Sequence, residues 1–156
     1  MNIKGVIDKL IEEELTISSI ESLTGGLFAS ILTEYSGVSK IYKGSVVSYS
    51  TEIKEKVVGI DKEIIQKYGV VSKECAYQMA ICGQKIFDTN ICVSFTGNAG
   101  PDVMEGKEVG LVYVSIVING KVDTYELNLS GTRNEIRKQC VNYAFDKIFE
   151  NLSRNF

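Results

Sequence analysis

Histidine is absent from the 156-residue sequence, and its absence removes several kinds of catalytic site. A Ser-His-Asp triad, a Cys-His dyad and the common metal-dependent hydrolases all require an imidazole. A hydrolase built from this sequence must therefore take its base from lysine, aspartate, glutamate or tyrosine. The four cysteines form no C-x-x-C pair, so we also expect no zinc site and no other metal site.

Long hydrophobic runs are also missing. The longest apolar stretch, 109–118, has about ten residues, whereas a membrane-spanning helix needs about 20. The first residues, Met1-Asn2-Ile3-Lys4, lack the apolar region of a signal peptide. The few cysteines are read as free thiols in a reducing compartment. We therefore expect a cytoplasmic protein with no membrane partner.

Basic runs are lacking as well. The net charge is −3 and no Lys/Arg-rich segment occurs, so we expect no nucleic-acid partner. One or two cations suffice for a single phosphate, and a mononucleotide ligand stays open. The length fits one domain, 1–156, with a sizeable core.

The apolar periodicity predicts alternating strands and helices. The helical segments are 2–14, 26–35, 51–58, 61–68, 72–87 and 132–152, and the strands are 15–20, 41–50, 90–95, 109–118 and 121–129. Polar caps support the helix starts: Asn2, Thr51, Asp61, Ser72 and a Thr132–Glu135 capping box. Asn119-Gly120 is a two-residue hairpin turn. This order predicts an α/β fold in which a mixed sheet carries helices on both faces.

Four polar or glycine-rich segments each follow a predicted strand: 22–26, 49–54, 96–101 and 130–133. Ligands of α/β sheets bind at the carboxyl ends of the strands, so these loops are expected to converge on one pocket. Hydroxyls and amides at a helix start suit an anion, and glycines let a ligand approach the backbone closely. From the residues alone, a tight connection and a plain surface loop remain alternatives for the first and third segments.

Lysine and arginine give the loops their charge. Lys54 falls in the first turn of a predicted helix, where the helix dipole lowers a lysine pKa, while Glu52 opposes the effect. Arg133 lies at the start of the last helix and could hold a phosphate or carboxylate. A solvated surface lysine and an exposed arginine are the alternatives. Ser39, judged by spacing alone, is a turn residue.

Taken together, these segments resemble the CinA C-terminal-domain family. The resemblance covers nearly the whole chain. It rests on Glu21-Ser22-x-Thr24-Gly25-Gly26, Ser39, Gly44-x-x-x-Ser48-Tyr49-Ser50, Lys54, Tyr68-Gly69-x-Val71-Ser72, Thr96-Gly97-x-Ala99-Gly100-Pro101-Asp102, Val109-Gly110 and Ser130-Gly131-x-Arg133.

The resemblance implies a three-layer α/β/α sandwich and a stand-alone nicotinamide mononucleotide deamidase. Such an enzyme hydrolyses the amide to nicotinic acid mononucleotide and ammonia, in the recycling of pyridine nucleotides, without metal or cofactor. The implied catalytic residues are Ser39 as nucleophile and Lys54 as base, supported by Tyr49, Thr96 and Arg133. The implied substrate-binding residues are Ser22, Thr24, Gly25, Gly26, Gly97, Asn98, Ala99 and Gly100. A homodimer or larger assembly is also implied.

Two positions depart from the usual family pattern: Leu23 replaces a frequent cysteine and Asn98 a frequent isoleucine. Neither removes a group that the mechanism needs, although Asn98 could reshape the pocket. Two alternatives remain open: a non-catalytic nucleotide-binding or regulatory module linked to competence or DNA damage, and hydrolysis of a different nucleotide amide. A non-catalytic module could lose Ser39 or Lys54, and this sequence keeps both.

Overall fold

The fold is built on a mixed five-stranded sheet, which a computed structural model describes over residues 2–155. The strands are β1 (Ile17–Glu21), β2 (Tyr42–Val47), β3 (Ile91–Gly97), β4 (Leu111–Ile118) and β5 (Lys121–Asn128). Their order is β2-β1-β3-β4-β5, with β1 parallel to β2 and β3, and with antiparallel pairing from β3 through β5. The predicted mixed sheet is therefore confirmed.

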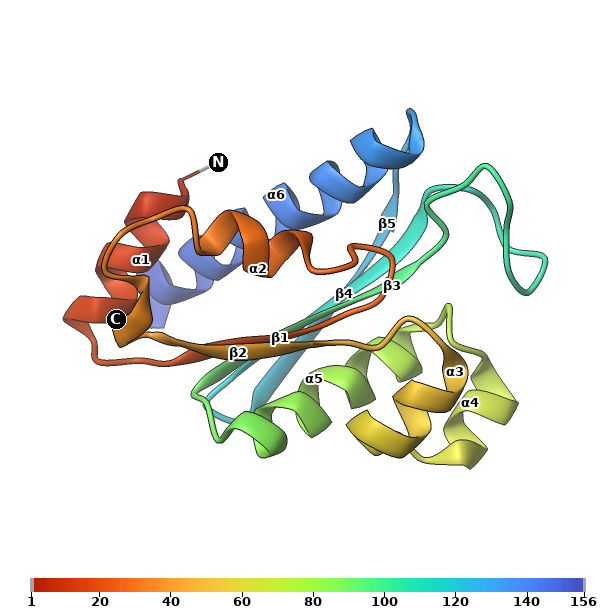
Figure 1. Cartoon of the computed structure of the whole chain (residues 1–156), viewed down its shortest axis with the longest axis horizontal. Coiled ribbons are helices and arrows are strands. Elements are labelled where there is room, and N and C mark those ends of the chain that lie inside the picture. The colour runs from red at the N-terminus through yellow and green to blue at the C-terminus, as the bar shows by residue number, and fades with distance from the viewer. Residues whose placement is uncertain (1, 156) are drawn as a thin grey trace.

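Helices cover both faces of this sheet (Figure 1). One layer holds α1 (Ile3–Glu12), α2 (Leu27–Leu32) and α6 (Arg133–Asn155). The other holds α3 (Thr51–Ile53), the π-helical turn η2 (Lys54–Val58), α4 (Lys62–Tyr68) and α5 (Lys73–Phe87). A 3-10 turn, η1 (Val38–Lys40), precedes β2. The three-layer α/β/α arrangement is confirmed. Within residues 2–155, no helix combines the length and apolar character needed to cross a membrane.

Polar caps start most helices where the sequence predicts them. Asn2, Asp61 and Ser72 each accept a backbone N–H of the turn that follows. The prediction of Thr51 as a cap is wrong by one residue, because the side chain of Ser50 accepts the N–H of Ile53. Lys54 consequently lies at the end of the single turn of α3 and begins η2.

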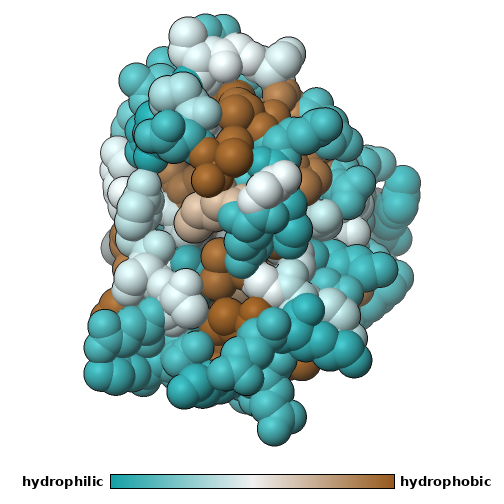
Figure 2. Space-filling model, turned by 90° about the vertical axis from the view of Figure 1, so that its right-hand side faces the viewer, coloured by the Kyte–Doolittle hydropathy of each residue, from teal (hydrophilic) through white to brown (hydrophobic). Residues whose placement is uncertain are grey.

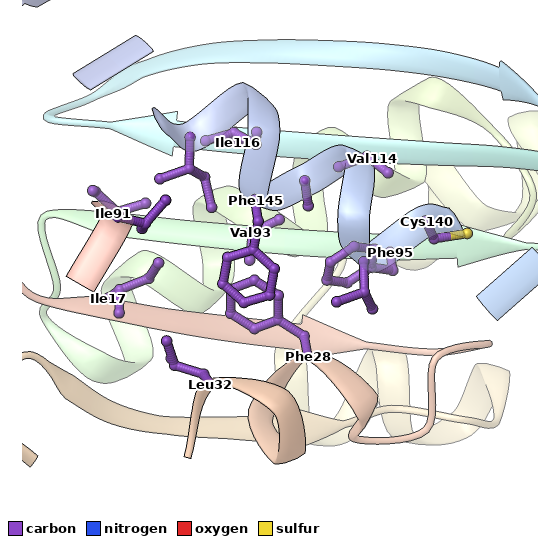
Figure 3. Packing of buried hydrophobic residues seen from close by; sticks show 14 of the residues in the cluster. Ile17, Phe28, Leu32, Ile91, Val93, Phe95, Val114, Ile116, Cys140 and Phe145 are labelled. Carbon is purple, nitrogen blue, oxygen red and sulfur yellow. The ribbon is translucent and has the colours of Figure 1, made fainter. Parts of the chain in front are cut away.

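The core between the sheet and the layer of α1, α2 and α6 centres on phenylalanines from three elements (Figure 3). The rings of Phe28 in α2 and Phe145 in α6 stack with centroids 4.5 Å apart, and Phe95 of β3 packs 5.6 Å from Phe28. All three are completely buried. This packing fixes the start of α2, and with it the loop that joins β1 to α2.

Candidate active site

The three parallel strands end at one edge of the sheet, and their loops meet there. The segments after β1, β2 and β3 and the start of α6 all lie at the right-hand end of the molecule in Figure 1. Figure 2 looks onto this end, where apolar patches interrupt a mainly hydrophilic surface. The predicted convergence of four segments is therefore confirmed.

A serine and a lysine from two of these loops are in direct contact. Ser22 follows β1, and Lys54 begins η2 after β2; Ser22 Oγ and Lys54 Nζ are 2.9 Å apart. The same Nζ lies 2.6 Å from the carbonyl oxygen of Ser48 and 3.5 Å from that of Tyr49. The lysine nitrogen thus has one hydroxyl and two carbonyls as neighbours.

Lys54 is almost completely enclosed, with 1% of its surface exposed. Burial lowers the pKa of its ammonium group, and the charges of Cys75 and Glu105 only partly oppose this. The sequence predicted a lowered pKa, but the main cause is loss of water around the amine, not the helix start. Glu52, expected to oppose the shift, pairs instead with Lys56 at 2.6 Å on the surface. A lysine with a lowered pKa can be neutral near physiological pH, as a general base must be.

A hollow of about 200 Å³ opens beside this pair. All four segments contribute to its lining, as do two residues just beyond the third segment: Ser22, Leu23, Tyr49, Gly97, Asn98, Ala99, Asp102, Met104 and Arg133. Four residues implied as substrate-binding therefore belong to it (Ser22, Gly97, Asn98 and Ala99), as do Tyr49 and Arg133. Within residues 2–155 no group of three His, Cys, Asp or Glu side chains is placed to hold a metal ion.

Arg133 links two of the loops around the hollow by hydrogen bonds. Its guanidinium donates to the carbonyl of Gly100 at 2.7 Å and to the hydroxyl of Tyr49 at 2.9 Å. A guanidinium has five N–H groups, so several remain for a ligand anion. Gly100, whose carbonyl accepts the bond from Arg133, has a φ of +79°, a conformation that favours glycine.

The long loop after β3 is closed by its own side chains. Asn98 accepts the N–H of Met104 at 3.0 Å and donates to the carbonyls of Met104 and Lys107. Glu105 then accepts the N–H groups of Val70 and Val71 at 2.8 and 3.0 Å. The side-chain amide of Asn98 shapes this loop instead of offering itself to a substrate, and the sequence held no signal for that.

The prediction that Ser39 acts together with Lys54 is not supported by the structure. Ser39 is exposed in η1, before β2 begins, whereas Lys54 follows the end of β2. The two residues therefore lie at opposite ends of a strand, on the order of 20 Å apart at about 3.3 Å per residue. Figure 1 shows η1 at the left end of the sheet and α3 at the right. Ser22, which the sequence analysis places in the substrate site, is the serine that contacts Lys54.

Three further expectations change. Thr96 is buried, and its hydroxyl donates to the carbonyl of Val70 at 2.7 Å, so its proton is not free for a substrate. Thr24 is completely buried and does not line the hollow. Gly25 and Gly26, at φ of +58° and +97°, make the turn into α2 and also lie outside the lining.

Comparison with known proteins matches residues 2–152 to the model of the CinA C-terminal domain. The chain belongs to the CinA C-terminal-domain family. A competence-damage inducible protein of Bacillus subtilis (strain 168) is 44% identical over 143 residues, covering 92% of this chain and 34% of that protein. The homologue from Bacillus mycoides (strain KBAB4) is 41% identical, with 90% and 34% covered. This CinA-family chain thus spans about a third of the length of these relatives.

Solved CinA-family structures share the whole fold. The competence/damage inducible protein CihA from Agrobacterium tumefaciens has a TM-score of 0.88 at 32% identity, covering 98% of this chain and 96% of that one. The competence damage-inducible protein A from Klebsiella pneumoniae reaches 0.96 at 25% identity, covering 99% and 96%. These names refer to competence and damage and state no chemical reaction.

Proposed function

We propose that this CinA-family protein is a metal-free amidohydrolase that converts nicotinamide mononucleotide to nicotinic acid mononucleotide and ammonia. The observation that carries the proposal is the buried Lys54 amine, 2.9 Å from the hydroxyl of Ser22 at the wall of a hollow. A serine needs such a base, because its hydroxyl is too weak a nucleophile at neutral pH to attack an amide. The nucleophile we propose is therefore Ser22, in place of Ser39.

The surroundings of Lys54 suit the neutral amine. A neutral amine has two N–H groups and one lone pair. The carbonyls of Ser48 and Tyr49 can accept the two N–H groups, at 2.6 and 3.5 Å, which leaves the lone pair for the Ser22 hydroxyl. The base is thus held in the orientation that proton transfer requires.

In the first step, Ser22 Oγ bonds to the carboxamide carbon while its proton moves to Lys54 Nζ. The C–N bond then breaks, and Lys54 returns the proton to the departing nitrogen, so that ammonia leaves. In the second step, water gives a proton to Lys54 and attacks the Ser22 ester. Breakage of that ester releases the carboxylic acid product, and the proton returns to Ser22 Oγ.

The developing oxyanion needs donors, and Thr96 cannot serve because its proton goes to Val70. The main-chain N–H groups of Leu23 and Ala99 are candidates, since both residues line the hollow. Neither N–H has an acceptor among residues 2–155.

Size and charge support a nucleotide amide. At about 200 Å³ the hollow is smaller than pockets that enclose drug-sized ligands, which have roughly 300–1,000 Å³. We therefore place the nicotinamide ring inside and the ribose phosphate toward the rim, where Arg133 has unused N–H groups. The cationic ring withdraws electrons from the amide and makes its carbon easier to attack.

The direct test is ammonia release from nicotinamide mononucleotide and from free nicotinamide, each with and without EDTA. We expect turnover of the nucleotide, much slower turnover of nicotinamide, and no effect of EDTA. Equal turnover of both amides would refute the nucleotide pocket, and loss of activity on chelation would refute the metal-free mechanism. Binding of the nucleotide without ammonia release would favour the non-catalytic regulatory module.

A further inference from the structure

Glu21, the last residue of β1, is a completely buried carboxylate that reaches across the loop to the start of α2. Oε1 accepts the N–H groups of Gly26 and Phe28 at 3.2 and 3.0 Å, and Oε2 accepts that of Ala29 at 3.1 Å. Oε2 also accepts the hydroxyl of Ser19 at 3.0 Å. In the part of the chain that the structure describes, no lysine or arginine pairs with it. Its partners are therefore three N–H groups at a helix start and the hydroxyl of Ser19.

The main chain of Glu21 connects to the base as well. Its carbonyl accepts the N–H of Ser48 at 2.7 Å, and the carbonyl of Ser48 in turn faces Lys54 Nζ at 2.6 Å. Ser22 is the next residue along the chain. Glu21 is thus bonded directly to Ser22 and is connected to Lys54 through one residue, Ser48.

A local cap would satisfy α2 more simply. The N-cap position is Gly26, which has no side chain, and a serine or aspartate commonly occupies such a position. A cap at Gly26 would secure the helix alone, whereas Glu21 fastens the helix start to the end of β1. The intervening loop then becomes a short closed ring containing Ser22.

On its other side the ring is held by Arg137 of α6. The guanidinium donates to the carbonyls of Leu23 and Thr24 at 3.0 and 2.9 Å. Glu21 therefore binds the N–H groups at the helix start, and Arg137 binds the carbonyls of the loop. Of these two anchors, Glu21 is the one that belongs to β1, the strand that Ser22 directly follows.

We propose that Glu21 is a positioning residue whose carboxylate holds Ser22 Oγ within hydrogen-bonding distance of Lys54 Nζ. This inference rests on the proposed Ser22–Lys54 mechanism. It requires the reach of the side chain and not only its charge. A small misplacement of a reacting group, of about 1 Å, costs about 100-fold in rate.

The test compares Glu21→Gln and Glu21→Asp with the unaltered protein. Glutamine sets an NH2 group against one of the helix N–H groups, and aspartate keeps the charge but falls short by about one C–C bond, about 1.5 Å. We expect both to lower kcat about 10- to 100-fold with KM changed less than about twofold. In crystal structures of both variants, Ser22 Oγ and Lys54 Nζ should separate beyond about 3.5 Å.

Asp61→Ala is the matched control, because Asp61 also caps a helix with its carboxylate, at α4. It should lower the melting temperature and leave kcat unchanged. The rate of Ser22 labelling by an organophosphorus fluoride, in which the O–P bond forms as fluoride leaves, tests the pair without nicotinamide mononucleotide. If that nucleotide proves not to be a substrate, slower labelling and a widened distance in the Glu21 variants still support the inference. An unchanged 2.9 Å distance, or retained kcat in Glu21→Asp, would overturn it.

Discussion

At the scale of single residues, burial is what suits Lys54 to the proposed role of base. In water a lysine has a pKa near 10.4 and is almost always charged at neutral pH. Enclosing the amine removes the water that stabilises the charge, which lowers the pKa of Lys54. The two carbonyls beside it supply acceptors but no full negative charge. The lowered pKa favours the neutral amine that the proposed mechanism needs.

The pKa of Lys54 predicts the direction of the pH dependence. We expect kcat/KM for nicotinamide mononucleotide to rise with pH through the lowered pKa of Lys54 and then to level off, as seen in a pH–rate profile. The Lys54→Arg variant should lose activity by orders of magnitude, because arginine stays protonated. A profile that falls over this range would contradict a lysine base.

The same shift affects stability. Between the folded pKa of Lys54 and its higher unfolded value, the unfolded chain holds one more proton than the folded chain. The free energy of unfolding should therefore rise with pH across that window and lose this contribution below it. Urea unfolding at several pH values measures the slope, with Lys54→Met as the variant in which the slope should decrease.

The proposed catalytic residues differ in how far the sequence alone could identify them. The sequence indicated that Lys54 lies at the site, because this lysine follows a predicted strand and ligands bind at the ends of strands. Ser39 failed for a reason that the predicted elements contained: it precedes the strand 41–50 that Lys54 follows, and the two ends of a strand cannot meet. The prediction that Thr96 supports catalysis was wrong, and the sequence held no signal against it, because the hydrogen-bond partner Val70 lies 26 residues away in the chain.

At the scale of elements, the loop after β3 is fastened to the turn between α4 and α5. Burial opposes the charge of Glu105, but the N–H groups of Val70 and Val71 and the ammonium of Lys107 hold its pKa below the usual range. Lys107 also donates to the carbonyls of Tyr68 and Val71. The loop bears Met104 and Asp102, which line the hollow.

We expect Glu105→Gln to destabilise the protein by about 1 kcal/mol, a value reduced for partial exposure, and to raise KM more than it lowers kcat. The stabilisation by Glu105 is present above its unfolded pKa and is lost as the pH falls through the lower folded pKa. Urea unfolding at neutral and acidic pH, with exposed Glu34→Gln as control, checks this. An equal loss of stability in both variants would refute the fastening role.

The elements themselves were largely predictable because their signals are local. Asn2, Asp61 and Ser72 cap helices, and Asn119 and Gly120 take φ of 48° and 86° in the predicted hairpin turn. The strand predicted at 109–118 begins two residues later, at Leu111, because Gly110 turns with a φ of +89°. Local patterns do not reveal which carboxylate reaches which helix, so the role of Glu21 required the structure.

At the scale of the whole molecule, the phenylalanine core connects the loop between β1 and α2 to the long helix α6. Phe28 stacks on Phe145 of α6 just beyond the loop that bears Ser22 (Figure 3). We expect Phe28→Ala to lower the free energy of unfolding by about 3–5 kcal/mol, because a buried ring leaves a cavity. Ile86→Ala, at a residue that is 46% exposed, should change the free energy of unfolding by less than about 1 kcal/mol in the same urea titration. Similar losses in both variants would show that this core does not dominate stability.

The central claim is that Ser22, and not Ser39, reacts with the amide through Lys54. The most direct measurement is ammonia release from nicotinamide mononucleotide by Ser22→Ala, Ser39→Ala and the unaltered protein, each shown to be folded by circular dichroism. The structure predicts that Ser22→Ala loses turnover by orders of magnitude, while Ser39→Ala, altered on an exposed turn at the far end of β2, keeps nearly all of it. Near-normal turnover by Ser22→Ala, or its loss in Ser39→Ala, would contradict this account.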